Sequence, residues 1–414
     1  MNNLNLNFFE KVSSYIIIIL PILLITGSFL PDLAVVICSI CFLINCVKKK
    51  IYFYFRSKFF YFFILFYLYL IFSSLQSSNI THSLHSSIFF FRMILFSLCV
   101  WHLLEVNSEF ILKKLFSVLG FIFILLLIDG TYQYYNHYNI FGFELINNRV
   151  SSFFGSELIM GSFLSRIYPI FIGLYFFLNN EKKLFTISNF IFYFVIISVC
   201  YLILISGERT SFFYFTLSFL FLLMINFSNI KKYLVIIFCI LIIILLNKSA
   251  YTKIYSSAYN QIYIEQKRVS VFSKVHEEHY ESALRIFNDN KFFGAGPRSF
   301  RLLCNEKKYK ISENSCTTHP HSTYIQLLAE TGLIGFSFIF FAFLYIIFMS
   351  IKIFFKKIEI NNKFSSLNAS LLAMFLITLW PLAPSGNFFH NWLLILYFYP
   401  VGFYLWLTGK INKN

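Results

Sequence analysis

The sequence predicts an all-α polytopic membrane protein with about 12 transmembrane helices and one long loop containing short helices. The chain has 414 residues, of which 58% are hydrophobic and only 13% charged, and apolar runs recur along its whole length. Soluble domains carry roughly 25% charged residues. The apolar runs are about 20 residues long, which is the length an α-helix needs to cross the ~30 Å hydrocarbon core of a bilayer.

The apolar runs divide the chain into three parts. Nine expected spans in 1–247 are followed by a long polar segment, 248–331, and by three expected spans in 332–414. The first run continues past Pro31 into a second one, and no small-residue cleavage pattern follows it, so we expect a retained helix rather than a signal peptide. The spans are expected near 12–30, 31–47, 58–75, 85–104, 115–131, 156–178, 185–206, 209–227, 232–247, 332–354, 365–383 and 389–407.

Basic residues are distributed very unequally between the two sets of connections. The side that includes both termini holds eighteen Lys and Arg residues, whereas the short connections on the other side hold only Arg149. By the positive-inside rule the first side is cytoplasmic. The segment 248–331 then lies outside, and its 12 basic and 8 acidic residues do not contradict this because long loops escape the rule. The net charge of +16 therefore indicates anchoring to anionic membrane lipids and requires no nucleic acid.

Two of the eight cysteines, Cys304 and Cys316, lie in the long polar segment, and the other six lie in or at expected spans. Cysteines within apolar helices act as small packing residues. An oxidising outer compartment permits a disulfide between Cys304 and Cys316, which would close a short loop. Two unrelated thiols are the alternative, and the sequence favours neither.

The stretch from His319 to Gly335 combines histidines with signals for a helix start. Thr323 and Gln326 have the spacing of a capping box that begins a short helix, and Gly332 suits the end of that helix. His321 would then lie just ahead of a helix N-terminus, which disfavours imidazolium and favours anions. A neutral histidine in that place can serve as a general base. The alternative is a solvated loop histidine beside a helix cap.

Arg209 begins an expected span within Ser206–Ser211. An arginine that enters an apolar segment is costly and usually has a partner or faces a polar cavity. Its alternatives are snorkelling to the interface and a pair with Glu208, although adjacent residues of a helix point apart. The same choice between a function and a structural ion pair applies to the other charged residues within or at the ends of expected spans, which are Arg92, Asp129, Glu157 and Arg166.

Two further arginines lie in the long polar segment. Arg285 belongs to a predicted short amphipathic helix over 280–287 and follows Glu281 by four residues, so a surface salt bridge is its alternative role. Arg298 follows Gly294-Ala295-Gly296-Pro297, which is typical of a tight turn, and could be a solvated charge.

The sequence favours neither a metal centre nor a nucleotide cofactor. His276 and His279 are spaced as His-x-x-His, which differs from the His-Glu-x-x-His of zinc peptidases. His319 and His321 lack two further ligands nearby. The sequence contains no Walker loop and no dinucleotide fingerprint, so coupling to ATP is not expected.

Taken in order, these pieces resemble the O-antigen ligase family of bacterial inner-membrane proteins, and the resemblance covers essentially the whole chain. Gly207-Glu208-Arg209-Thr210 stands at a span start, and Arg285 precedes Gly294-Ala295-Gly296-Pro297. His321 lies in a His-x-His-Ser-x-Tyr-x-Gln…Glu-x-Gly-x-x-Gly stretch. All three pieces lie on the expected outer side and in the family's order. Ser322 is a departure, because the family often has Asn after this histidine.

The resemblance implies a metal-independent, inverting glycosyltransferase of the membrane-embedded C type that needs no cofactor. Its donor would be a glycan on undecaprenyl diphosphate and its acceptor lipid A–core, in lipopolysaccharide biosynthesis. Arg209 and Arg285 would hold the donor diphosphate, with Arg298 as a further donor ligand, and His321 would activate the acceptor hydroxyl. Guanidinium groups can stabilise a departing diphosphate without a metal. The protein would lie in the bacterial inner membrane, with both termini cytoplasmic and 248–331 in the periplasm.

Related functions share much of this motif set. An O-antigen polymerase, whose acceptor is another glycan, and a protein O-oligosaccharyltransferase therefore stay open as alternatives. A transporter is disfavoured because transporters have paired helix breaks near the bilayer midplane, whereas the polar motifs here lie at the outer ends of spans. A noncatalytic membrane scaffold is the remaining alternative.

Overall fold

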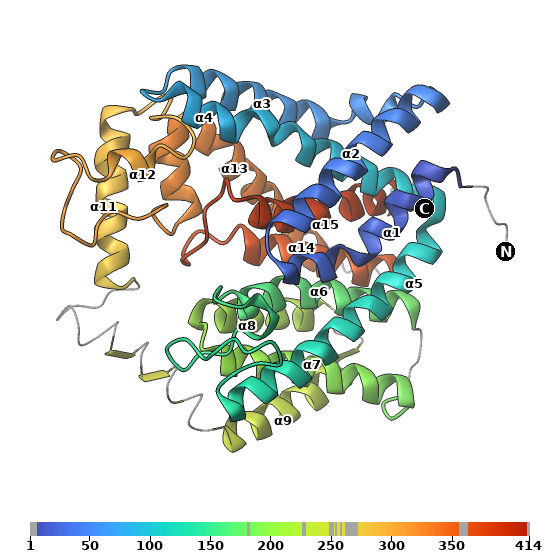
Figure 1. Ribbon diagram of the computed structural model, residues 1–414. Coiled ribbons are helices and arrows are strands. Elements are labelled where there is room, and N and C mark those ends of the chain that lie inside the picture. Colours follow the sequence, from blue (N-terminus) through green and yellow to red (C-terminus); the bar gives the residue numbers. More distant parts are fainter. Residues whose placement is uncertain are drawn as a thin grey trace.

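The computed structural model describes residues 6–179, 183–225, 229–247, 252, 255–256, 259–260, 272–355 and 363–411. These residues form helices and connecting loops, and no strand is present among them (Figure 1). Only two isolated bridges occur, both in the turn between 138 and 149. The predicted all-helical class is confirmed.

The longer helices are α1 (Phe8–Leu23), α2 (Phe29–Lys49), α3 (Lys58–Leu75), α4 (Ile80–Ser87), α5 (Phe91–Asn136), α6 (Met160–Leu178), α7 (Ile187–Ser206), α8 (Arg209–Ile225), α9 (Ile230–Leu246), α11 (Lys274–Asp289), α13 (Thr323–Phe355), α14 (Lys363–Thr378) and α15 (Asn391–Ile411). The shorter elements are η1 (Leu24–Thr26), η2 (Phe53–Arg56), η3 (Ile88–Phe90), η4 (Ser152–Phe154) and α12 (Phe300–Leu303).

Eight helices in the described part of the chain are long and apolar enough to cross a membrane. They are α1 with η1, α2, α3, the run from α4 through α5, α6, α7, α13 and α15, while α8 and α14 are shorter apolar helices. The chain is therefore a multi-pass membrane protein, as predicted. The number of twelve spans stays a prediction.

One helix, α5, contains most of the expected span 85–104 and all of the expected span 115–131. The two parts meet at Asn107, whose φ of −148° and ψ of 52° are not helical. This bend falls in the polar stretch from Glu105 to Glu109, between two apolar runs. A polar stretch of this kind marks the place where an apolar chain reaches the membrane surface.

The predicted boundary between the first two spans at Pro31 is wrong by several residues. The first helix ends earlier, and Gly27, with φ at +109°, makes the turn. Pro31 lies inside the first turn of α2. Proline is tolerated there because the amide it lacks would have no helical partner, whereas only glycine adopts the backbone of the turn without strain.

The helices pack around one large apolar core. Helix α14 runs along α6, and α15 runs along α5 through the middle of the bundle (Figure 1). Aromatic side chains fill much of this core, and Tyr168, Phe96 and Trp406 are almost fully buried. The bundle is thus held by packing of large side chains from helices far apart in the sequence.

The described part of the predicted loop 248–331 forms a small structured cap on one end of the bundle. Helix α11 packs against the start of α13, and a second small core joins Ala283 and Ile286 of α11 to Phe300 and Ala329 (Figure 1). We call this end of the molecule the histidine end, after His276, His279, His319 and His321. Most of 248–271, and Lys182, Lys356, Lys357 and Lys413 of the expected cytoplasmic side, lie outside the described residues.

Candidate functional site

A pair of glycines fixes the start of α13 against the loop before it. Gly332 breaks α13 with φ at +64°, so that a short helix over 323–331 precedes the apolar part, as predicted. A Cβ on Gly332 would lie 2.3 Å from the carbonyl oxygen of Phe292, and one on Gly294 would lie 2.3 Å from the amide nitrogen of Thr331. The amides of residues 295 and 296 donate to the carbonyls of 329 and 330. Two separate glycine motifs therefore meet at one contact.

His321 lies at the centre of four histidine rings. Its ring centroid is 4.2 Å from that of His319 and 5.4 Å from those of both His276 and His279. Its backbone has φ at +53°, and its carbonyl accepts a hydrogen bond of 2.9 Å from the amide of Ser385. His321 lies two residues ahead of the helix start at Thr323, which agrees with the predicted position.

The surroundings of His321 favour its neutral form, for a different reason than the sequence suggests. Burial lowers the pKa of His321 to about 4, and the neighbouring His276 and His279 lower it further. Burial and His321 lower the pKa of His319 to about 3. Burying an imidazolium among other imidazoles is unfavourable, so all these rings resist protonation. The sequence had pointed to the helix dipole instead.

The predicted capping box of Thr323 and Gln326 is wrong. The Thr323 hydroxyl bonds to Ser385 Oγ at 2.8 Å, and the Gln326 amide donates to Glu330 and to Asn387. The amide of Phe388 in turn donates to Gln326 Oε1 at 2.9 Å. Both side chains therefore tie the helix start to the loop over 379–390, because that loop supplies partners that compete with the helix backbone.

A second arginine of the loop, Arg301, lies beside His319, and Arg298 lies beside His82. The carbonyl of Arg298 lies 3.2 Å from His82 Nε2, and Arg301 Nη2 donates to the Thr318 carbonyl at 3.4 Å. The Nε atoms of both guanidinium groups are buried and have no hydrogen-bond partner. Burial comes first among the causes that lower the pKa of His319, but Arg301 contributes to it as well. Arg301 is not among the residues predicted from the sequence, although its spacing of three residues from Arg298 is a usable signal.

Arg209 reaches the same region from a different part of the chain. It is the first residue of α8, and its charge helps to lower the pKa of His276, after burial and His279. Arg209 and His276 are more than sixty residues apart in the sequence, yet they lie close enough for their charges to interact.

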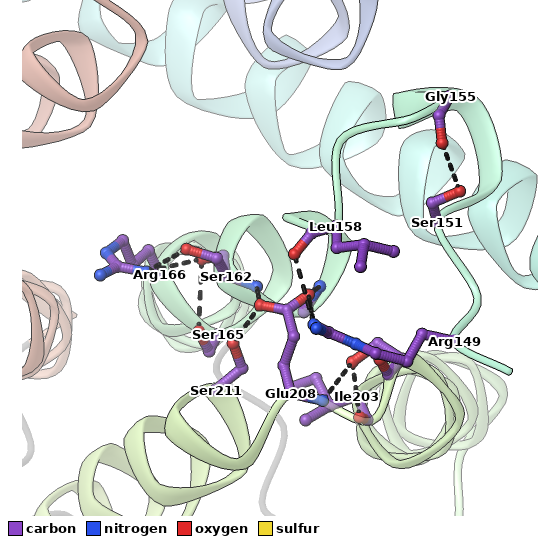
Figure 2. A network of polar contacts seen from close by, with 12 residues as sticks. Arg149, Ser151, Gly155, Leu158, Ser162, Ser165, Arg166, Ile203, Glu208 and Ser211 are labelled. Carbon is purple, nitrogen blue, oxygen red and sulfur yellow. Dashed lines mark hydrogen bonds and ion pairs between the residues drawn. The ribbon is translucent and has the colours of Figure 1, made fainter. Parts of the chain in front are cut away.

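Glu208, next to Arg209, closes the N-terminus of α6. Its carboxylate accepts from the amide of Gly161 at 2.7 Å, from the amide of Ser162 at 2.9 Å and from Ser211 Oγ at 2.8 Å (Figure 2). Arg149 Nη2 lies 4.0 Å from it. Burial raises the pKa of Glu208, and these donors and Arg149 oppose that rise. A carboxylate at a helix N-terminus meets otherwise unpaired amides and the positive end of the helix dipole.

We expect Glu208→Gln to destabilise the protein by about 1–3 kcal/mol, because the amide group would turn a donor toward one of two buried backbone donors. The start of α8 would shift with it, and the rate of any reaction that uses Arg209 should fall. Thermal unfolding in detergent measures the first effect. Ser211→Ala, which removes one hydroxyl donor and keeps the carboxylate, is the matched control and should cost less. An unchanged unfolding temperature for Glu208→Gln would contradict the role of the carboxylate.

Arg285 lies apart from the histidine cluster. Its Nη2 donates to Glu281 at 2.8 Å, and the two side chains are 44% and 56% exposed. Arg285 follows His276 by nine residues, which turns it about 180° around α11. The structure thus shows the surface salt bridge that the sequence offered as an alternative, and a role with the donor stays a prediction.

The remaining sequence candidates are placed as follows. Cys304 and Cys316 form a disulfide with their Cα atoms 5.1 Å apart. His279 Nε2 donates to the Asn314 carbonyl, and the described part of the chain holds no group of three or more His, Cys, Asp or Glu residues arranged for a metal ion. Arg92 forms an ion pair of 2.7 Å with Asp32. Asp129 accepts from Ser152 and from the amide of Ile140, and Glu157 is exposed.

Residues 192–341 match the family model described as O-antigen ligase. This region includes Arg209, Arg285, Arg298 and His321. The search of curated proteins gives no match.

Proposed function

The chain belongs to the O-antigen ligase family, and we propose that it transfers a glycan from undecaprenyl diphosphate to lipid A–core. The observation that carries the proposal is His321, with its lowered pKa, in a histidine cluster that Arg301 and Arg209 approach. Arg298 and Arg301 come from the loop and Arg209 from α8. Together they supply a base and several cations, which is what transfer from a lipid diphosphate needs.

In the proposed reaction His321 accepts the proton of the acceptor hydroxyl. The acceptor oxygen forms a bond to the anomeric carbon of the donor sugar while the bond from that carbon to the diphosphate oxygen breaks on the opposite face. The configuration at the anomeric carbon therefore inverts. The departing diphosphate takes the electron pair, and guanidinium groups stabilise the charge that develops on it.

We place the histidine end in the periplasm and both termini in the cytoplasm of a bacterial inner membrane. Labelling with a membrane-impermeant maleimide in spheroplasts tests this. We expect Lys307→Cys, an exposed position in the loop, to react, and Lys50→Cys, an exposed position at the end of α2, to be protected. The reverse pattern would exclude the proposed orientation.

The ligase and polymerase alternatives differ only in the acceptor. The purified full-length protein should transfer lipid-linked glycan when lipid A–core is added and should leave the glycan unchanged in length without it. Growth of the glycan in the absence of lipid A–core would instead identify a polymerase. Transfer to a protein acceptor would identify a protein O-oligosaccharyltransferase.

A further inference from the structure

Several charged groups of the bundle are paired with an opposite charge. Arg92 meets Asp32 at 2.7 Å, and Glu10 meets Lys49 at 2.6 Å and His102 at 3.0 Å. Arg166 in α6 differs from them. It is only 3% exposed, and within the described residues it forms no ion pair.

The contacts of Arg166 leave much of its guanidinium without a partner. Nη1 donates to the carbonyl of Ser162 at 3.2 Å and to the hydroxyl of the same residue. The guanidinium carbon lies 4.9 Å from the ring centroid of Tyr214, and Nε is buried without a hydrogen bond. A guanidinium has five N–H donors in a fixed fork that suits phosphate oxygens. Arg166 therefore has guanidinium N–H donors that no described residue accepts.

A lone buried cation is costly. An arginine in a membrane helix is retained where it faces an interior site and meets an anion, because the loss of hydration is otherwise uncompensated. The ring of Tyr214 compensates only part of this loss, since a cation–π contact contributes about 0.5–2 kcal/mol. The neighbouring Glu208 is already occupied by the amides of α6, and Figure 2 shows Arg166 pointing away from it. No described residue supplies a counter-charge to Arg166, and an anionic ligand would supply one.

Arg166 is connected to the histidine end by a layer of tyrosines. The Tyr397 hydroxyl interacts electrostatically with Arg166 and lies 3.2 Å from Thr323 Oγ1 at the start of α13. On the other side Tyr214 helps to raise the pKa of Tyr280, after burial, and the Tyr280 hydroxyl is buried without a partner. The ring of Tyr280 stacks on His276. Tyrosine side chains thus lie between the histidine cluster and Arg166.

We infer that Arg166 binds a phosphate group of a lipid-linked substrate at the inner wall of the site. The inference rests on the proposed function, which supplies a substrate with both a lipid and phosphates. A phosphate at Arg166 would lie near Tyr397, whose hydroxyl contacts Thr323 two residues after His321. The donor diphosphate and a phosphate on the acceptor lipid share this chemistry, and kinetics distinguish them.

The stability of the substrate-free protein gives the first test. Arg166→Met removes an uncompensated charge and keeps the volume, so we expect the unfolding temperature to rise by roughly 2–4 °C. Arg92→Met is the matched control and should lower it, because Asp32 loses its opposite charge and keeps only the hydrogen bond from Asn391. A purely structural Arg166 would behave as Arg92 does, and a fall of similar size in Arg166→Met would overturn the inference.

Binding gives the second test, with farnesyl diphosphate as a soluble probe of the lipid diphosphate. It should raise the unfolding temperature of the wild-type protein and of Arg92→Met, and should fail to do so in Arg166→Met. An equal shift in Arg166→Met, or no shift in any of the three, would overturn the site. Binding that depends on Arg166 in a protein that transfers no glycan would retain the site and refute the proposed function.

Steady-state kinetics of Arg166→Lys identify which substrate provides the phosphate. Lysine keeps the charge and loses the fork, so the KM for one substrate should rise about tenfold or more, with partial retention of activity that Arg166→Met lacks. A rise in the KM for lipid-linked glycan assigns the donor, and a rise in the KM for lipid A–core assigns the acceptor. Unchanged KM values for both would contradict phosphate binding at Arg166.

Discussion

Replacing His321 by glutamine should lower the rate of glycan transfer by about 10²–10⁴-fold, the range that a positioned general base contributes. Glutamine keeps the size and polarity of the ring position but cannot accept the proton of an alcohol. The KM for the donor should change little, because the guanidinium groups remain. His319→Gln is the matched control, since its ring lies 4.2 Å away and its lower pKa makes it a poorer base. Equal losses in the two variants would contradict a specific role for His321.

The pH dependence of glycan transfer should reflect the lowered pKa of His321. With the pKa of His321 at about 4, kcat/KM should stay level as the pH falls through 6.5, the ordinary value for histidine, and should decline only near pH 4. A bound diphosphate would favour the imidazolium, so the acid limb of kcat should lie at higher pH than that of kcat/KM. A decline of kcat/KM at pH 6.5 would show that the cluster does not hold His321 neutral in the free protein.

The free energy of unfolding should depend on pH in the direction that the lowered pKa of His321 sets. The folded pKa of His321 lies below the unfolded value, so as the pH falls through 6.5 the unfolded chain binds protons first. Folding free energy is therefore lost between about pH 6.5 and pH 4. His319 acts in the same direction, because its pKa is lowered as well.

The membrane fold could be predicted because apolar length and turn residues are local signals. Gly332 was correctly predicted to end a short helix, since no other residue adopts its backbone without strain. Pro31 was misjudged because proline is equally compatible with a break and with a first helical turn. The partners of Thr323 and Gln326 lie some sixty residues further along the chain, so a rule based on neighbouring residues assigned these side chains to a cap.

The candidate site could be predicted only in part. The family pattern pointed to Arg209 and His321, but nothing local shows that His276 and His279 lie against His321. That contact depends on how α11 packs on α13 through Ala283, Ile286 and Ala329. The capping of α6 by Glu208 was invisible for the same reason, because the amides it meets are nearly fifty residues earlier.

Replacing Arg209 by alanine should lower kcat by about 10²–10³-fold, the usual loss when one donor to a developing anion is removed. Departure of the lipid diphosphate concentrates negative charge, and a guanidinium beside the membrane interface stabilises it more strongly than one in bulk water. The unfolding temperature should change little, since Glu208 still caps α6 and holds the start of α8. A variant with wild-type kcat would remove Arg209 from the reaction.

Arg285→Ala tests whether Arg285 binds the donor, as the family resemblance implies, or only forms the surface salt bridge with Glu281. Arg285 is 44% exposed and bonded to Glu281, and exposed pairs of this kind contribute about 0–1 kcal/mol to stability. We therefore expect a smaller loss of kcat than in Arg209→Ala. If the losses are equal, Arg285 must exchange Glu281 for the donor diphosphate, and Glu281→Ala should then lower the KM for the donor, because the guanidinium no longer has to break a pair before it binds. If Arg285 only stabilises α11, Glu281→Ala and Arg285→Ala should have the same small effect on unfolding and leave the KM for the donor unchanged.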